Sequence, residues 1–148
     1  MKKKTTYDLR TERMDYIFDT HAHYDDEAFD ADREEVLAGL KDQGVGTVVN
    51  VGASIASTKT TLALAEAHPF MYAAVGVHPN ETAELTDADM KWLESLAENP
   101  KVVAIGEIGL DYYWDEPERE IQKHWFSAQL EVARIQPSSH YMYLLTSL

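Results

Sequence analysis

Two histidines separated by one residue follow the first strand-like segment of the chain. In an extended strand, residues two apart point the same way, so Asp19, His21 and His23 are expected to share one side at the carboxyl end of that strand. Neutral imidazoles suit zinc and other transition ions, and an added carboxylate extends the choice to manganese or magnesium. On its own, the His-x-His pattern is equally typical of two histidines that are only hydrogen-bonded at a strand end.

A candidate acid follows the fourth strand-like segment. Glu107 comes shortly after the apolar run 102–105, which places it at the carboxyl end of its strand. In β/α barrels that end collects the catalytic residues, and the glycines beside Glu107 allow a backbone or a ligand to approach closely. A lone glutamate is usually a solvated loop residue. Glu107, however, is expected at the same end of the sheet as His21 and His23, and the three residues together predict a divalent-metal hydrolase site.

Further polar and aromatic side chains follow the third and fourth strand-like segments, and we expect substrate contacts from His78, Asp111 and Tyr112. For His78, a histidine held in a turn by the following proline is an equally good interpretation. The run after the fourth strand is Asp111, Tyr112, Tyr113 and Trp114. These aromatic rings form either a wall on which a base stacks or a cluster that covers the rim of a barrel.

Strand-like and helix-like segments alternate along the chain and must position these residues. Near-continuous apolar runs at 16–18, 47–51, 72–77 and 102–105 suit strands buried on both faces. Helical patterns cover 32–43, a segment opening at Ser54, 87–98 and about 117–134. The predicted buried stripe of the last helix is Ile121, Trp125, Ala128 and Val132. This α/β series predicts a parallel sheet, either open and doubly wound or closed into a barrel.

The amino-acid composition restricts the classes of protein to which this chain can belong. The chain has 148 residues, 45% of them apolar, which is enough for one domain with a real core. Its 13 basic and 26 acidic residues give a net charge of −13, so it lacks a basic nucleic-acid surface and needs cations to approach a polyanion. The absence of cysteine fits a reducing cytoplasm, which is the expected location. No apolar run is long enough for a membrane span, so no membrane partner is expected.

Three motifs, in order along the chain, resemble the TatD-like deoxyribonuclease family of metal-dependent, amidohydrolase-like enzymes. They are 17–23 (Ile-Phe-Asp-Thr-His-Ala-His), 76–79 (Gly-Val-His-Pro) and 105–112 (Ile-Gly-Glu-Ile-Gly-Leu-Asp-Tyr), and the resemblance covers roughly 14–134. It implies a TIM-type (β/α)8 barrel that acts on DNA or another phosphodiester. It also implies that His21 and His23 hold one metal ion and that Glu107 bridges two, as the catalytic residue. The ions expected are Mg, Mn or Zn, and they replace the missing basic surface.

The family's barrel continues through strands five to eight, which add two histidines and an aspartate to the metals. We therefore expect this chain to hold only the first four β/α units, as a truncated barrel. The predicted division is an N-terminal extension at 1–13, with Met14 as the natural start, a partial barrel at 14–135 and an anomalous tail at 136–148. A frameshift would explain much of the tail.

Open barrel edges predict self-association, low stability and impaired activity. Two alternative functions stay open. One is another amidohydrolase-type hydrolase acting on an amide, lactone or phosphotriester, which usually needs a carboxylated lysine or a different acid on the fourth strand. The other is a non-catalytic fragment that binds metal weakly.

Overall fold

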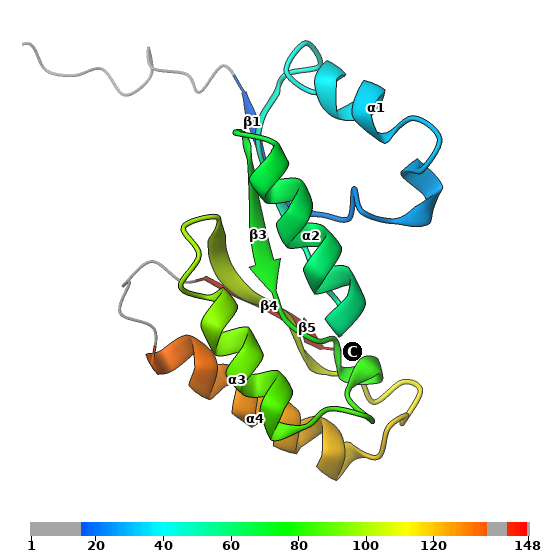
Figure 1. The fold of residues 1–148 in the computed structure, drawn as a ribbon. Helices are drawn as coiled ribbons and strands as arrows, with labels where there is room; N and C mark the ends of the chain where they lie inside the picture. Colours follow the sequence, from blue (N-terminus) through cyan, green and yellow to red (C-terminus); the bar gives the residue numbers. More distant parts are fainter. Residues whose placement is uncertain (1–15, 136–141, 148) are drawn as a thin grey trace, which may run out of the picture.

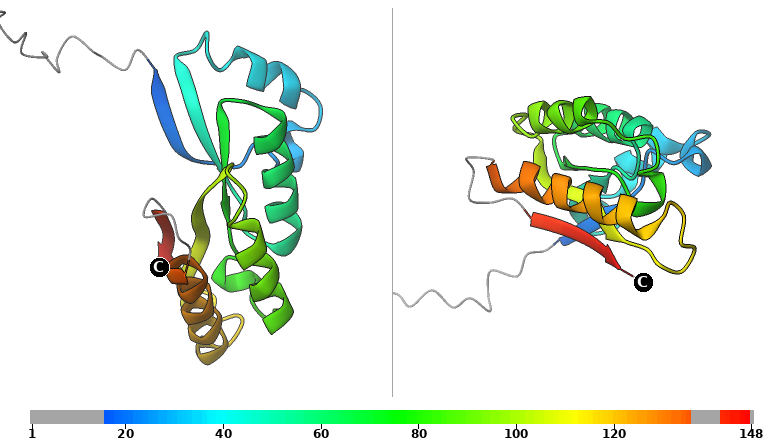
Figure 2. Two further views of the ribbon diagram at one scale, coloured as in Figure 1. Left: turned by 60° about the vertical axis from the view of Figure 1, so that its left-hand side comes forward. Right: turned by 90° about the horizontal axis from the view of Figure 1, so that it is seen from below.

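The computed structural model describes residues 16–135 and 142–147, and these form a single parallel sheet with helices packed against it (Figures 1 and 2). The strands, in both sequence and sheet order, are β1 (Ile17–Ala22), β2 (Val45–Val51), β3 (Met71–Val75), β4 (Val102–Leu110) and β5 (Met142–Ser147). The helices are α1 (Arg33–Gly39), α2 (Ile55–Ala67), α3 (Asp87–Leu96) and α4 (Arg119–Ile135). Four alternating β/α units, arranged as part of a barrel, confirm the predicted fold class.

The two faces of the sheet have different packing partners. One face is covered by helices, and its core joins strand residues such as Val48 and Ile105 to helix residues such as Leu37 and Leu93. The core cluster on the other face consists of strand residues alone, with Val49, Val51, Ala74 and Ala104 at its centre. This is the arrangement of a β/α barrel, in which strands close around an interior of their own side chains.

The helix starts follow from their first residues. Ser54 accepts a hydrogen bond from the Ser57 amide at 3.1 Å and begins α2 with a capping box. Thr86 and Asp89 form the equivalent box at the start of α3. These boxes satisfy backbone N–H groups that have no partner within the helix. The sequence predicted that a helix opens at Ser54, and the structure confirms this residue as the N-cap of α2.

The buried face of α4 differs from the predicted stripe. Trp125 and Val132 are buried as expected, but Ile121 is exposed and Ala128 only half-buried. The fully buried polar residues on this helix are Gln122 and Gln129. Both bond to backbone at strand ends, and this hydrogen bonding makes their burial favourable.

The segments outside the predicted partial barrel are described only in part. The predicted extension at 1–13 and the proposed start at Met14 lie outside the described residues. Within the predicted tail, Met142–Ser147 forms β5, which pairs in parallel with β4. The division of the chain at residue 136 stays a prediction. No helix in the described part of the chain is long and apolar enough to cross a membrane.

Candidate metal centre at the carboxyl ends of the strands

Three potential metal ligands meet beside the sheet. The Nε2 atoms of His21 and His23 lie 3.1 Å apart, and His21 Nε2 lies 3.7 Å from Glu107 Oε2. One ligand atom from each of the three residues falls within 4.8 Å of the others. Both histidines are exposed and Glu107 is half-buried. The group is therefore open to a ligand from solvent and has an acid on its protein side.

Sheet curvature brings these residues together, since β1 and β4 are separated by two intervening strands. In a flat sheet their backbones would be roughly 14 Å apart, at about 4.8 Å per strand, with the side chains perpendicular to the sheet. The distance of 3.7 Å between His21 and Glu107 requires the sheet to curl, so that the side chains converge on the inner side. The partial barrel thus creates the group of ligands.

The orientation of His23 is set by a backbone carbonyl. Its Nδ1 lies 2.8 Å from the carbonyl oxygen of Val51, at the end of β2. A carbonyl only accepts, so Nδ1 carries the proton and donates it, which leaves the Nε2 lone pair facing His21. This is the arrangement that fixes metal-binding histidines in proteins.

The donor set fits a divalent ion. Two nitrogens bound to one ion at about 2.1 Å lie roughly 3.0 to 3.4 Å apart, depending on the coordination geometry. The 3.1 Å between the two imidazole nitrogens falls in that range. Two imidazoles with one carboxylate suit zinc or manganese, and magnesium would need more oxygen ligands.

Glu107 is positioned by close packing of strand backbones. Its amide donates to the carbonyl of Gly52 at 2.9 Å, which ties β4 to the end of β2. Directly after β3, a Cβ at Gly76 would lie 2.8 Å from the carbonyl carbon of Gly106 and 2.9 Å from its oxygen. Only glycine fits there. The absence of a side chain at Gly76 lets the backbone just before Glu107 reach its position.

The loop after β1 is held by an asparagine that the sequence did not single out. Asn50 is fully buried; its Oδ1 accepts from the Tyr24 amide at 2.6 Å. Its Nδ2 donates to Asp25 Oδ1 at 2.7 Å and to Thr61 Oγ1 at 2.8 Å. Asn50 thereby fixes the chain immediately after His23. The available signal was a polar residue inside an otherwise apolar strand.

His78 and Asp111 form a second polar group, which Asn80 connects. His78 Nδ1 accepts from the Asn80 amide at 3.2 Å, so its Nε2 carries the proton and can donate. Asp111 is buried and accepts from Asn80 Nδ2 at 2.9 Å and from the Tyr113 amide at 2.9 Å. The bond from Asn80, helped by the Tyr113 amide and by His78 nearby, lowers the pKa of Asp111 although burial opposes this. The sequence predicted His78 and Asp111 and missed Asn80.

Tyr112, the third residue expected to contact substrate, has a different environment. It is half-buried, and the guanidinium of Arg119 lies over its ring at 4.4 Å. Its neighbours Tyr113 and Trp114 are exposed over 73% and 66% of their surfaces. Both rings are therefore largely open to solvent, and the choice between a stacking wall and a rim cluster stays a prediction.

A partial β/α barrel with two histidines and a glutamate that could hold a metal ion at the carboxyl ends of its strands is the arrangement expected of a metal-dependent β/α-barrel hydrolase. The profile of "TatD related DNase" proteins matches residues 18–136. The chain therefore belongs to the TatD-related DNase family.

Individual relatives agree with this assignment. The chain is 41% identical over 118 residues to "Uncharacterized metal-dependent hydrolase YabD" of Bacillus subtilis, covering 80% of this chain and 46% of that protein. It is 35% identical over 118 residues to "3'-5' ssDNA/RNA exonuclease TatD" of Musicola paradisiaca, covering 79% and 45%. The crystal structure of YJJV, a TatD homologue from Escherichia coli, matches with a TM-score of 0.73 and 35% identity, covering 82% and 48%. The chain thus spans about half the length of these relatives.

Proposed function

We propose that this chain forms the first part of a divalent-metal-dependent hydrolase of phosphodiester bonds, with DNA as the substrate class. In this proposal His21, His23 and Glu107 would hold the metal and Glu107 would be the catalytic residue. Two divalent ions are expected, with Mg, Mn and Zn as the candidates. The observation that carries the proposal is the convergence of three ligand atoms within 4.8 Å. The relatives named as a metal-dependent hydrolase and as an ssDNA/RNA exonuclease support the reaction class.

The proposed mechanism assigns separate tasks to the protein groups. A divalent ion, when bound, would polarise a phosphoryl oxygen and lower the pKa of a coordinated water. His23 keeps its Nε2 toward the site because Val51 accepts the proton on Nδ1. His78 offers an Nε2–H donor for a phosphate or sugar oxygen, because its Nδ1 is already an acceptor. Asp111 keeps Asn80, and through it the turn at His78, in place.

Charge explains why this site depends on cations. The net charge of −13 repels a polyanion, and the candidate ligands include no basic side chain that would bind a phosphate. Two divalent ions would reverse the charge locally, where the scissile phosphate lies. The proposal therefore predicts binding of DNA that requires divalent metal and weakens as monovalent salt increases.

The rival hydrolase with a carboxylated lysine has less support. Such a lysine would have to project from β4 near Glu107. In the described part of the chain, Lys101 precedes β4 at the opposite end of the strand, and its Nζ donates to the carbonyls of His68, Pro69 and Met71 at 2.9 to 3.2 Å. That lysine is occupied in a structural role, so Glu107 is the better candidate for the acidic group that would hold the metal.

The test is metal-dependent release of nucleotides from end-labelled single-stranded DNA. We expect slow release in manganese or magnesium, loss of release on chelation, and loss in His21→Ala. His124→Ala is the matched control, because His124 is exposed on α4 and contacts Trp125 outside the site. Equal release by the chain and by His21→Ala would refute catalysis at this site. Metal binding without release by any variant would favour the non-catalytic fragment.

Two further expectations accompany the proposal. Self-association is proposed to occur through β1 and β5, each of which pairs with one other strand among the residues that the structure describes. In β1, Ile17 and Phe18 are exposed over 62% and 45% of their surfaces, which adds apolar area at that edge. Location in the cytoplasm stays a prediction from the sequence.

A further inference from the structure

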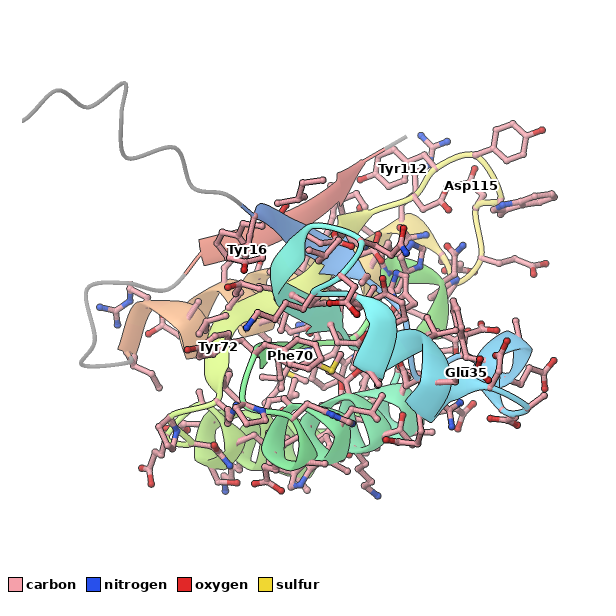
Figure 3. The ribbon with its side chains drawn as sticks, turned by 90° about the horizontal axis from the view of Figure 1, so that it is seen from above. Tyr16, Glu35, Phe70, Tyr72, Tyr112 and Asp115 are labelled. Atoms are coloured by element: carbon pink, nitrogen blue, oxygen red, sulfur yellow. The ribbon has the colours of Figure 1, made fainter. Side chains whose placement is uncertain are left out.

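Two large aromatic side chains stand exposed on the loop between β4 and α4. Tyr113 and Trp114 are 73% and 66% exposed, and their rings meet edge to face at 4.8 Å between centroids. Figure 3 labels Tyr112 and Asp115, which flank this pair on a loop at the edge of the molecule. The pair contributes almost nothing to the core. Exposed aromatic area of this kind favours a ligand that covers it.

Hydrogen bonds and an ion pair hold the loop in shape on both sides of the aromatic pair. Before it, the Tyr113 amide donates to Asp111 Oδ1, and the Gln122 side chain bonds to the Asp111 amide at 2.8 Å and its carbonyl at 2.9 Å. After it, Arg119 donates to both carboxylate oxygens of Asp115 at 2.6 and 2.9 Å. The loop therefore needs little further ordering when a ligand binds, which preserves affinity.

The pair lies at the same end of the sheet as the candidate metal centre. Tyr113 is six positions after Glu107 in the chain, so their Cα atoms are at most about 22 Å apart. About seven nucleotides cover this distance even at the 3.4 Å rise of a duplex strand. A strand with one phosphate at the metal centre thus has bases within reach of the two rings.

The charge around the loop selects which part of a nucleic acid can bind it. Glu116 and Glu118 are exposed beside the pair, and the charge of Asp115 is matched by Arg119. A phosphate is repelled by this surface, whereas an uncharged base with an exposed π-face is not. Stacking also tolerates any base, and it requires an unpaired one.

We propose that Tyr113 and Trp114 form a stacking platform for an unpaired nucleobase of the substrate strand. The platform rests on the proposed function, because the metal centre supplies the phosphate contact. It accounts for how an acidic protein retains a single strand with few positive side chains. It also predicts weak dependence on base identity and poor binding of duplex ends whose bases stay paired.

The test measures binding of a fluorescent ten-nucleotide single strand to the full chain in manganese, by fluorescence anisotropy. We expect Trp114→Leu to weaken binding roughly 5- to 150-fold, from the usual contribution of one stacked base. Trp114→Phe keeps an aromatic face and retains most of the affinity. An abasic strand with the same phosphates binds as weakly to the unaltered chain as the normal strand does to Trp114→Leu.

Manganese binding, followed separately by calorimetry, distinguishes the platform from the metal centre. The platform is supported when Trp114→Leu binds manganese normally but loses the oligonucleotide. It is refuted when Trp114→Leu and Trp114→Phe bind the strand equally, or when the abasic strand binds as tightly as the normal one. If the unaltered chain does not bind manganese, the proposed function is refuted instead.

Discussion

The fit of Gly76 against β4 provides a quantitative test of how the fold positions Glu107. In Gly76→Ala the added Cβ would lie 2.8 Å from the carbonyl carbon of Gly106, whereas an ordinary contact begins at 3.4 Å, so the strands must separate by about 0.6 Å. The atom in the way is backbone within a sheet and cannot rotate aside. Overpacking of this kind costs about 1–3 kcal/mol of unfolding free energy.

The displacement acts directly on the residue that follows Gly106. His21 and Glu107 are 3.7 Å apart, and metal–ligand distances tolerate only about 0.2 Å of error. We expect Gly76→Ala to bind manganese about 10- to 100-fold more weakly, as when the support of a metal ligand is lost. Urea denaturation and calorimetric titration measure the two effects separately.

Gly39 provides the matched control for this substitution. It lies in α1, and a Cβ there meets nothing within 4 Å. Gly39→Ala should stabilise the protein by about 0.4–1 kcal/mol, because alanine restricts the unfolded chain, and should leave manganese binding unchanged. If Gly76→Ala proved as stable as Gly39→Ala and bound manganese equally well, the argument that close strand packing positions Glu107 would be wrong.

Two other substitutions test buried polar contacts. Gln129→Met keeps the side-chain volume but leaves the amide and carbonyl of Val77 without their hydrogen bonds at 2.8 and 3.0 Å. The free energy of unfolding should therefore fall by about 2 kcal/mol or more, whereas the exposed control Gln43→Met should change it by less than about 0.5 kcal/mol. Similar unfolding midpoints of the two variants in urea would contradict this. Because the pKa of Asp111 is lowered in the fold, chiefly by Asn80, its ionised form stabilises the protein above the ordinary aspartate pKa near 4, and this stability is lost as the pH falls through the lower folded value. Asp111→Asn should therefore flatten the fall of the melting temperature below about pH 4, and an unchanged slope would count against the contact.

The sequence could predict which side chains lie toward the carboxyl ends of the strands, because each apolar run is followed by a residue of different character. The strands themselves are longer than these runs, since β1 continues to Ala22 and β4 to Leu110. His21, His78 and Glu107 follow such runs, and parallel strands separated by helices place their carboxyl ends together. The sequence could not give the distance between β1 and β4. That distance depends on the curl of the sheet, which arises from many contacts between strands.

The buried glutamines of α4 show a second limit of what the sequence can predict. Apolar periodicity predicted Ile121 as a core residue, whereas Gln122 and Gln129 are the residues that face the sheet. Gln129 bonds to both backbone groups of Val77, which is 52 residues earlier in the chain. A polar side chain is buried when its partner is in place, and a partner at that separation leaves no mark in a local pattern.

Strand β5 shows a third limit of what the sequence can predict. The sequence at 136–140 breaks the repeating pattern, and the residues after it read as an anomalous tail. The structure pairs Met142–Ser147 with β4 from Ala104 to Leu110. Strand pairing of this kind depends on an open neighbouring edge, and such an edge is a property of the folded sheet.

The most direct test of the central claim is a calorimetric titration of manganese or zinc into the full chain and four single variants. We expect saturable binding that weakens at least tenfold in His21→Ala, His23→Ala and Glu107→Ala, since each removes one of three converging ligands. His124→Ala should bind as the unaltered chain does. Equal affinity in all four variants, or no saturable binding in the unaltered chain, would contradict the assignment of these residues as a metal centre.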